Sequence, residues 1–420
     1  MRQSRFKWQN NNRALIGLKI DYYLQAIIKD RCIMIAEEIV TTTFYQLPTT
    51  NWVKIWFSTD SSQFIAKKYQ AIENKMIEMV LSNADKHFTI VYSSAILDSL
   101  GKSDLERIQE QFQAIECGNI IFIDSDSSEF QEGLQNDRER ALYAIAVKEL
   151  ANLGGGGGNP AAASDIIRIL TPCSRKGIYT DFDVPFTEET IDKIITIKSP
   201  ILFPVTRSQY CNDVVAVVPG VASTLVDKIQ QNILEGYSSI GLSRLAVSDK
   251  LGSPEDCSRL ANLIDELKRK SLSAMPPEDL IFELRQFIEL EINECQKNNN
   301  ELSLNFWRSA FMESVMVISG PKNYELACSD RLSVKNNNFC ATELSDLVKS
   351  QVTGQDNDAS WVPAHPSEVK KASVEGGAAP SVRELEAVRE AQRQFKVDVA
   401  DARPSTSIAS DAPDASSPRT

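Results

Sequence analysis

The stretch AAASDIIRILTPCSRKGIYTDFD (residues 161–183) joins a helical pattern to a strand pattern, and both carry charged residues at regular spacing. Asp165 and Arg168 stand three positions apart, so a helix places them on one face. The next run, Gly177–Phe182, is typical of a strand and ends in Asp181-Phe-Asp183. Because residues i and i+2 of a strand point to the same side, both carboxylates should converge at the C-terminal edge of a sheet, where open α/β folds bind ligands.

Short β-branched or aromatic runs alternate with longer amphipathic stretches on both sides of this unit. Helical patterns at 61–83, 96–116 and 138–172 separate the first four runs, which predicts an α/β fold with a largely parallel sheet. Residues 220–313 are mostly helical in pattern, with a polar break at Gln296–Asn300, and we expect them to form a helical insertion beside the sheet. The predicted strands are Val53–Phe57, Phe88–Tyr92, Asn119–Ile123, Ile178–Phe182, Ile201–Val205, Asp213–Val218 and Val315–Ile318.

Changes in periodicity and composition divide the chain into three regions. Residues 1–44 are expected to be a helical N-terminal segment, with the helix at 14–41, and residues 45–366 the α/β domain. Residues 367–420, rich in Ala, Ser and Pro towards their end, are expected to be mostly disordered, with one helix at 381–397. The GGGGG run at 154–158 lacks the Lys-Ser/Thr pair of a phosphate-binding loop, so we interpret it as a flexible insertion.

The composition excludes several classes of function. The 420 residues include 45 Lys and Arg against 57 Asp and Glu, and a net charge of −12 makes sequence-independent nucleic-acid binding a poor hypothesis. Only two histidines occur, so any metal should be held by oxygen ligands. The eight cysteines include no CxxC pair and predict buried thiols in a reducing compartment. No cleavable signal peptide and no transmembrane helix are predicted.

An acidic pair at a strand end suits a hard divalent cation, Mg²⁺ or Mn²⁺, that bridges to a substrate diphosphate. An isolated Asp-x-Asp is weak support, because the chain has three, the others being Asp124/Asp126 and Asp356/Asp358. Asp124-Ser-Asp126 also ends a predicted strand, but polar sequence comes after it and no acidic-basic helix precedes it, so we interpret that pair as a loop.

The block NPAAASDIIRI (159–169) followed by GIYTDFDVP (177–185) resembles the donor-binding core of the large clostridial glucosylating toxins and related bacterial effector glycosyltransferases. Weaker similarity extends to Val53–Phe57, CNDVVAVVPGVASTLVDKI (211–229), VMVISGPKN (315–323) and the stretch 358–361. A feature like Asp358-Ala-Ser360 also occurs in the arginine-GlcNAc-transferase effectors. The resemblance implies a GT-A-type nucleotide-sugar transferase fold, a Rossmann-like and mostly parallel sheet with helical additions.

The resemblance also implies roles for the acidic strand end and for the C-terminal element. Asp183 would bind the metal directly, and Asp181 would hold the ribose and reach the metal through water. Asp358 and Ser360 would complete the metal shell, and Trp361 would lie over the diphosphate and the departing bond.

The remaining implied roles concern the sugar and the base. Asp165 and Arg168 would contact the sugar hydroxyls, with Arg168 also near the diphosphate, and Asn212 would face the sugar or the acceptor. Tyr179 would wall the nucleotide pocket, and Trp56 would stack on the base. Alternatives remain at this point: Arg168 as a simple ion pair with Asp165, and Trp56 as ordinary core. Cys211 stands where the arginine-modifying effectors have Glu, which argues against arginine as acceptor.

The resulting hypothesis is a metal-dependent, retaining glycosyltransferase that uses a UDP-sugar, with glucose or GlcNAc as the sugar. The acceptor would be a Thr, Ser or Tyr hydroxyl of a host protein, with small GTPases as one candidate class. The enzyme would be a secreted bacterial effector that reaches the host cytoplasm or a membrane surface, by peripheral association, without a cleavable signal. Two alternatives stay open: a bacterial polysaccharide or lipid glycosyltransferase of the same fold, and an inert nucleotide-sugar-binding module.

Overall fold

The computed structural model describes residues 44–65, 73, 76–77, 79–81, 83, 85–114, 119–182, 184, 194–197, 199–206, 209–245, 252–271 and 276–328. The helices predicted at 14–41 and 381–397, the tail 367–420, and Asp183, Asp358, Ser360 and Trp361 lie outside these residues. Contacts divide the chain into a small unit (Met1–Tyr45, Thr196–Ser199) and a large unit (Gln46–Ile195, Pro200–Thr420). The division falls within two strands, β1 (Tyr45–Pro48) and β6 (Ile194–Ile197), and the large unit holds most of the described residues.

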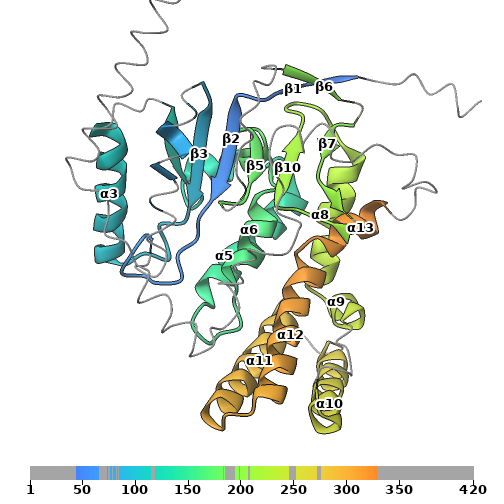
Figure 1. Cartoon of the computed structure of the whole chain (residues 1–420). Helices are drawn as coiled ribbons and strands as arrows, with labels where there is room; N and C mark the ends of the chain where they lie inside the picture. Colours follow the sequence, from blue (N-terminus) through green and yellow to red (C-terminus); the bar gives the residue numbers. More distant parts are fainter. Residues whose placement is uncertain are drawn as a thin grey trace, which may run out of the picture. The chain divides into compact units, whose positions relative to one another are not determined.

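The large unit is built on a six-stranded sheet in the order β4-β3-β2-β5-β10-β7 (Figure 1). The strands β4, β3, β2 and β5 run parallel, whereas β10 is antiparallel to both of its neighbours, β5 and β7. The sheet is therefore mostly parallel, as predicted. Its strands are β2 (Asn51–Ile55), β3 (His87–Tyr92), β4 (Ile120–Asp124), β5 (Ile178–Thr180), β7 (Ile201–Leu202) and β10 (Val214–Val217).

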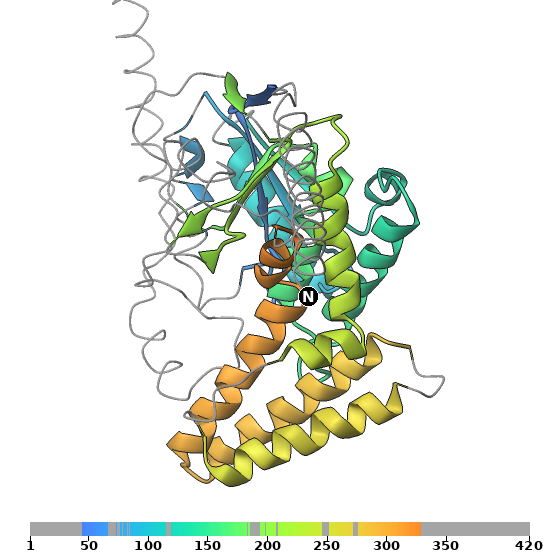
Figure 2. The ribbon, with the colours of Figure 1, turned by 90° about the vertical axis from the view of Figure 1, so that its right-hand side faces the viewer.

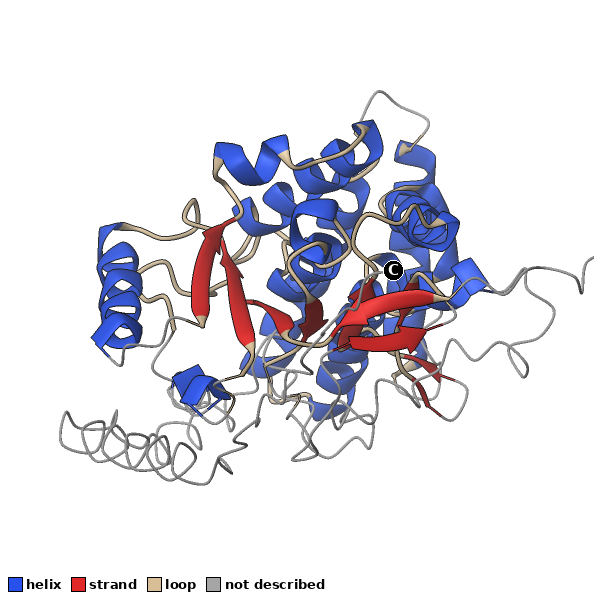
Figure 3. Ribbon diagram, turned by 90° about the horizontal axis from the view of Figure 1, so that it is seen from above, coloured by secondary structure: helices blue, strands red, loops and turns tan. Residues whose placement is uncertain are grey.

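Helices cover both faces of this sheet, which Figure 3 shows from above. The helix α3 (Ser99–Ala114) lies over one face, where its Phe112 packs 6.0 Å from the Phe122 ring of β4. The opposite face, which carries Val53 and Tyr179, joins the same buried cluster as the helices α5 (Asp137–Ala151) and α6 (Pro160–Ile167). The strand β2, in the middle of the sheet order, has its last four residues buried, as expected for a strand covered on both faces.

The predicted helix at 138–172 is interrupted rather than continuous. It consists of α5, a glycine-rich turn, α6 and the short α7 (Thr171–Ser174). Gly157 and Gly158 within the turn are buried, and a Cβ on Gly157 would stand 2.2 Å from the carbonyl oxygen of Phe282. The interpretation of GGGGG as a flexible insertion is wrong for this end of the run, because close backbone packing there requires residues without a side chain.

The segment after β10 is helical, as predicted, and its long helices extend away from the sheet (Figure 2). The polar break expected at Gln296–Asn300 is the turn between α11 and α12, where the exposed Asn299 adopts φ 51°. The strand predicted at Val315–Ile318 is wrong, since these residues are the last turn of α12. The helices are α8 (Thr224–Gly236), α9 (Ser239–Arg244), α10 (Pro254–Lys270), α11 (Asp279–Lys297), α12 (Glu301–Ile318) and α13 (Lys322–Cys328).

Smaller elements are α4 (Ser128–Glu132) and the paired strands β8 (Val205–Thr206) and β9 (Gln209–Tyr210). In the part of the chain that the structure describes, no helix is both long and apolar enough to cross a lipid bilayer.

Candidate functional site

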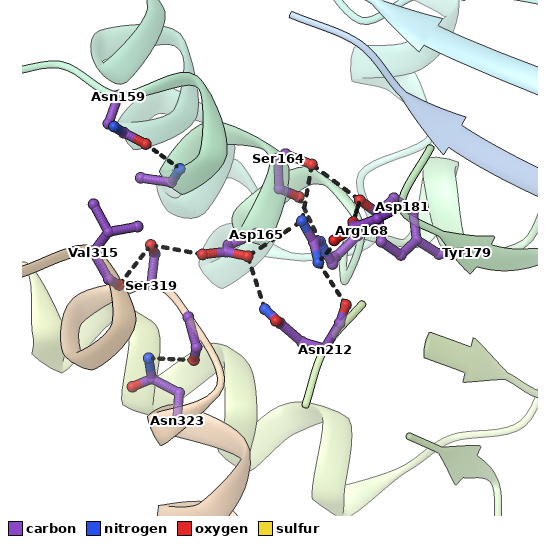
Figure 4. A network of polar contacts seen from close by, with 12 residues as sticks. Asn159, Ser164, Asp165, Arg168, Tyr179, Asp181, Asn212, Val315, Ser319 and Asn323 are labelled. Atoms are coloured by element: carbon purple, nitrogen blue, oxygen red, sulfur yellow. Dashed lines mark hydrogen bonds and ion pairs between the residues drawn. The ribbon is translucent and has the colours of Figure 1, made fainter. Parts of the chain in front are cut away.

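The helix α6 begins with a strong local signal. Asn159 is its N-cap, and the side-chain oxygen accepts a hydrogen bond of 3.0 Å from the backbone N–H of Ala162 (Figure 4). Pro160 follows at the first helical position, where its missing N–H costs nothing. Ala162 and Ala163 are fully buried in the core cluster, which also contains residues of α5. The NPAAASD stretch is thus a helix start whose packing fixes the side chains one turn later.

The carboxyl group of Asp165, on α6, is surrounded by groups that carry N–H or O–H bonds. Asn212 donates to Oδ1 at 2.7 Å, Ser319 donates to Oδ2 at 3.1 Å, and Arg168 lies 3.2 Å from Oδ1. Only 6% of Asp165 is exposed, and this burial raises the pKa of its carboxyl to about 6 against the lowering by Arg168, Ser319 and Asn212. Three separate chain segments therefore meet at one buried carboxyl group (Figure 4).

Arg168, at the end of α6, connects this helix to Asn212 and to the end of β5 through its guanidinium group. Its Nε donates to the carbonyl of Ser164 at 3.2 Å, and Nη2 donates to the Ser164 hydroxyl at 3.0 Å. Nη1 donates to the carbonyl of Asn212 and lies 3.6 Å from the Asp181 carboxylate. The group also stacks over the Tyr179 ring at 4.2 Å. Three hydrogen bonds, two ion pairs and the stacked ring thus hold the guanidinium group in one position.

The acidic end of β5 is the exposed part of this cluster. Tyr179 and Asp181 point to the same side, as their spacing predicts, and the Tyr179 hydroxyl donates to Asp181 Oδ1. The Asp181 side chain is 38% exposed, in contrast to 5% for Arg168. The arrangement places a solvent-facing carboxylate above a buried arginine.

Lys54, on the neighbouring strand β2, holds the backbone at the end of β5, which we call the Asp181 turn. Its ammonium group is fully buried in β2 and donates to the backbone carbonyl of Asp181 at 2.6 Å. It also lies 5.7 Å from the centre of the Phe182 ring. The lysine therefore fixes the backbone at which the strand ends.

Trp56 directly follows β2 and meets Phe182 edge to face, with 5.7 Å between the ring centres. Its indole N–H donates to the carbonyl of Phe64 at 2.7 Å, and the side chain is only partly buried. An indole anchored in this way presents an aromatic surface next to the Asp181 turn.

Asp124 and Asp126, the Asp-x-Asp pair of which both residues are described, accept hydrogen bonds from within the protein. Asp124 accepts from the backbone N–H of Ser94 at 3.0 Å, and Asp126 accepts from the Ser93 hydroxyl at 2.7 Å and the Ala95 N–H at 2.8 Å. These bonds tie the loops after β3 and β4 together. The interpretation of this pair as a structural loop is confirmed.

The whole described core lies within one family match. A model of glycosyltransferase family 88 matches residues 37–372. The chain belongs to glycosyltransferase family 88. As a member, it transfers a glycosyl group from an activated donor to an acceptor, and the family indicates a nucleotide sugar as that donor.

Among the solved structures that resemble this family 88 chain are two with the following similarity. The PaToxG glycosyltransferase is 21% identical, with a TM-score of 0.36, over 71% of this chain and 94% of its own. A structure described as a transferase is 14% identical, with a TM-score of 0.32, over 46% of this chain and 80% of its own. No curated protein sequence matches the chain.

Five residues singled out from the sequence of this family 88 enzyme meet in the structure, and a sixth lies next to them. The first five are Asp165, Arg168, Tyr179, Asp181 and Asn212, and Trp56 joins through Phe182. The roles assigned to them stay predictions. Asp183, Asp358, Ser360 and Trp361 lie outside the described residues, so their predicted roles have no geometry here.

Of the residues predicted to bind the metal ion, the structure describes Asp181, and its carboxylate suits a hard cation. Asp181 offers a carboxylate oxygen that faces solvent, the donor type that Mg²⁺ and Mn²⁺ prefer. No cluster of three or more His, Cys, Asp or Glu side chains that could hold a metal occurs among the residues with described positions. The other predicted ligands, Asp183, Asp358 and Ser360, are among those outside the description.

Sequence reasoning did not single out Ser164, Ser319 or Lys54. Ser164 stands four residues before Arg168, a spacing that a helix converts into contact. Ser319 follows a run taken for a strand, so its position at the end of α12 was not foreseen. For Lys54, the signal is a lone charged residue within an apolar strand, NWVKI.

Proposed function

We propose that this family 88 protein is a metal-dependent, retaining glycosyltransferase that transfers glucose or GlcNAc from a UDP-sugar. The observation that carries the proposal is the solvent-facing Asp181 carboxylate above the buried Asp165, Arg168 and Asn212 cluster, at the C-terminal edge of the parallel strands. Mg²⁺ or Mn²⁺ would be held by Asp181 and, from outside the described residues, by Asp183, Asp358 and Ser360.

Cleavage of a sugar–diphosphate bond builds negative charge on the departing phosphate, and a bound cation supplies positive charge there. Arg168 and Lys54 place two further positive charges within the protein near the Asp181 turn. Lys54 acts through the backbone, because its ammonium holds the Asp181 carbonyl. Arg168 keeps Asp165 and Asn212 in place, so the groups that would orient the sugar are fixed before the donor arrives.

Trp56 indicates where the uracil base of the UDP-sugar would bind. An aromatic ring that is partly exposed and braced by Phe182 suits stacking on a uracil base. The Tyr179 hydroxyl, whose pKa burial raises well above its ordinary value, stays protonated and orients Asp181 for the ribose.

The acceptor side rests on the sequence resemblance. The 159–185 block supports transfer to a Thr, Ser or Tyr hydroxyl of a host protein, with small GTPases as a candidate class. It supports a secreted effector that acts in the host cytoplasm or at a membrane surface.

The test is hydrolysis of a panel of UDP- and GDP-sugars by the purified chain, with and without Mn²⁺ or Mg²⁺. Wild type is compared with Asp181→Ala/Asp183→Ala. We expect metal-dependent hydrolysis of one UDP-sugar, lost in the double variant. If a donor is bound but none is hydrolysed with metal present, the proposal fails in favour of the inert nucleotide-sugar-binding module; if none is bound, both are overturned.

A further inference from the structure

Tyr324, on α13, carries a buried hydroxyl that no described protein group uses. The side chain is 0% exposed. Its hydroxyl has no hydrogen-bond partner among the residues that the structure describes. A hydroxyl buried in this way loses its water contacts without compensation, so its retention in a native protein needs an explanation. A ligand that supplies the missing partner is one.

The chain around Tyr324 is fixed to the site. Ser319, five residues earlier, donates to Asp165 at 3.1 Å. The Asn323 amide donates to the carbonyls of Ile318 at 3.0 Å and Gly320 at 3.2 Å, which holds the turn between α12 and α13 (Figure 4). Tyr324 therefore lies in the first turn of α13, just after a turn whose first residue, Ser319, contacts the buried carboxyl group.

The sheet register gives the side of the site on which Tyr324 lies. Its ring meets Phe203 edge to face, with 5.0 Å between the centres. The pairing of β10 with β7, continued by one residue, places Phe203 beside Val215, and Val215 pairs with Tyr179. Tyr324 thus packs over the sheet face that carries Tyr179, on which Arg168 stacks.

Trp56 marks the other end of the site. It follows β2, whereas Tyr324 lies over β7, and β5 with its acidic turn stands between them in the sheet order. The flat aromatic surface suited to a base and the buried hydroxyl are therefore on opposite sides of Asp181.

The charges around Tyr324 are those of the site. Burial raises the pKa of the Tyr324 hydroxyl, which also lies in the field of Arg168, Asp165 and Asp181. The hydroxyl stays protonated at neutral pH and can donate a hydrogen bond.

We propose that Tyr324 is a donor-binding residue whose hydroxyl donates a hydrogen bond to a hydroxyl oxygen of the sugar ring of the nucleotide sugar. The carboxylate, guanidinium and amide groups of Asp165, Arg168 and Asn212, together with a phenol that lies in the field of the first two, form a set suited to a polyhydroxylated ring. The inference rests on the proposed function, since it needs a sugar that enters beside Asp165 and Arg168.

Tyr324→Phe tests the proposal, because it removes only the oxygen. The free variant should be as stable as wild type or more stable, since an unpaired buried hydroxyl disappears. Loss of one hydrogen bond should raise KM for the UDP-sugar by about 3- to 10-fold. Affinity for UDP with Mn²⁺, which carries no sugar, should be unchanged.

Tyr237→Phe is the matched control. Its hydroxyl is equally buried but donates to Glu149, so the same atom is removed from a satisfied bond. We expect a lower Tm for this variant, with KM for the UDP-sugar unchanged. Removal of the hydroxyl should then raise KM without loss of stability in Tyr324→Phe, and lower stability without a change in KM in Tyr237→Phe. This difference would distinguish a binding role from a structural one.

The outcomes are distinguishable from failure of the proposed function. If wild type binds UDP-sugar and Tyr324→Phe has the same KM, the assignment of Tyr324 is overturned and the proposed function stands. Equal weakening of UDP and UDP-sugar in Tyr324→Phe would also overturn it, because the effect would then not depend on the sugar. If wild type binds no nucleotide sugar, both fall.

Discussion

Two buried arginine–carboxylate pairs lie near the two ends of α6. They differ in whether the pair contacts a group that is exposed to solvent. The scaffold pair, Glu149 and Arg285, is 0% exposed on both sides. Glu149 accepts from Arg285 at 2.6 Å, from Tyr237 and from the backbone N–H of Asn159 at 2.7 Å. It thereby anchors the residue that caps α6.

The site pair, Asp165 and Arg168, lies near the other end of the same helix. It is almost as buried, with 8% and 5% of the side chains exposed, but Arg168 also faces Asp181, which is 38% exposed. The scaffold pair contacts buried protein groups, whereas the site pair contacts a carboxylate that is open to solvent. Burial and charge alone therefore do not mark a site, whereas a route from a buried charge to the surface does.

The scaffold pair should give the largest effect on folding. Arg285→Met leaves Glu149 buried without its cation and should lower the free energy of unfolding by about 3–5 kcal/mol. Urea unfolding measures the loss. The Arg285→Met/Glu149→Gln variant, which also removes the charge, should be more stable than Arg285→Met alone. If the single variant were as stable as wild type, the two pairs would not differ in the way described.

The exposed end of the site pair should behave in the opposite way. Asp181→Asn should lower donor hydrolysis by about 100-fold or more, because the carboxylate that would hold the cation at the departing phosphate is lost. Its Tm should stay close to that of wild type, since the side chain is partly exposed. Hydrolysis assays and thermal unfolding on one preparation give both values.

Asp126→Asn is the matched control for Asp181→Asn, since both residues belong to Asp-x-Asp pairs that end parallel strands. Asp126 holds Ser93 and Ala95, so we expect a stability loss of about 1–2 kcal/mol and unchanged hydrolysis by the folded protein. Reversed results for the two aspartates would contradict the assignment of the site.

The glycine-rich turn connects the scaffold pair to α6 and allows a finer test. Gly154 and Gly157 have φ values of 75° and 78°, so both resist a side chain equally on conformational grounds. A Cβ meets nothing within 4 Å at Gly154 but the Phe282 carbonyl at 2.2 Å at Gly157. Gly154→Ala should cost about 1 kcal/mol and Gly157→Ala at least about 2 kcal/mol more. Equal losses in chemical denaturation would show that the turn is not packed against α11.

The smallest effect concerns the titration of the site pair. Burial raises the pKa of Asp165 to about 6, so donor hydrolysis should fall as the pH drops through about 6 and the carboxyl group gains a proton. Stability follows the opposite sign, because the folded pKa exceeds the ordinary value of 3.8. The contribution of Asp165 to stability is full below that value and is lost as the pH rises through about 6.

Ser319→Ala sharpens this prediction. It removes a hydrogen bond to the charged form of Asp165, so the acid limb of the pH–rate profile should move to higher pH. Activity at pH 7 should fall by about fivefold. Ser314→Ala, which makes the same change in α12 next to Arg285, should lower stability and leave the limb in place. An unmoved limb in Ser319→Ala would mean that Asp165 does not govern the profile.

Sequence patterns predicted the parallel strands, which are short β-branched or aromatic runs, and α3, whose buried residues recur at helical spacing. It failed at Val315–Ile318, a β-branched run that forms the last turn of a helix. The tertiary contacts of α12 override the strand propensity of that run. The glycine run was misread for a related reason, since a close backbone contact with α11 leaves no trace in local sequence.

For the site, spacing within one element was enough to place Asp165 with Arg168 and Tyr179 with Asp181. Asn212 was identified by resemblance, and its contact with Asp165 joins residues 47 positions apart. Ser319 lies 154 positions from Asp165, and Lys54 lies 127 positions from Asp181. Such pairs depend on how the sheet and α12 pack, which single-sequence patterns do not encode.

The helix α12 is tied twice at its inner end, by Ser314 to Arg285 and by Ser319 to Asp165. Five residues separate the ties, or about 7.5 Å along the axis. One residue inserted between them would turn Ser319 by about 100° away from Asp165. The exposed tip at 297–300 has no such restriction. Whole helical turns can be added to or removed from the α11–α12 hairpin at this tip. The length of the hairpin can therefore vary among related proteins, while the spacing between Ser314 and Ser319 is fixed.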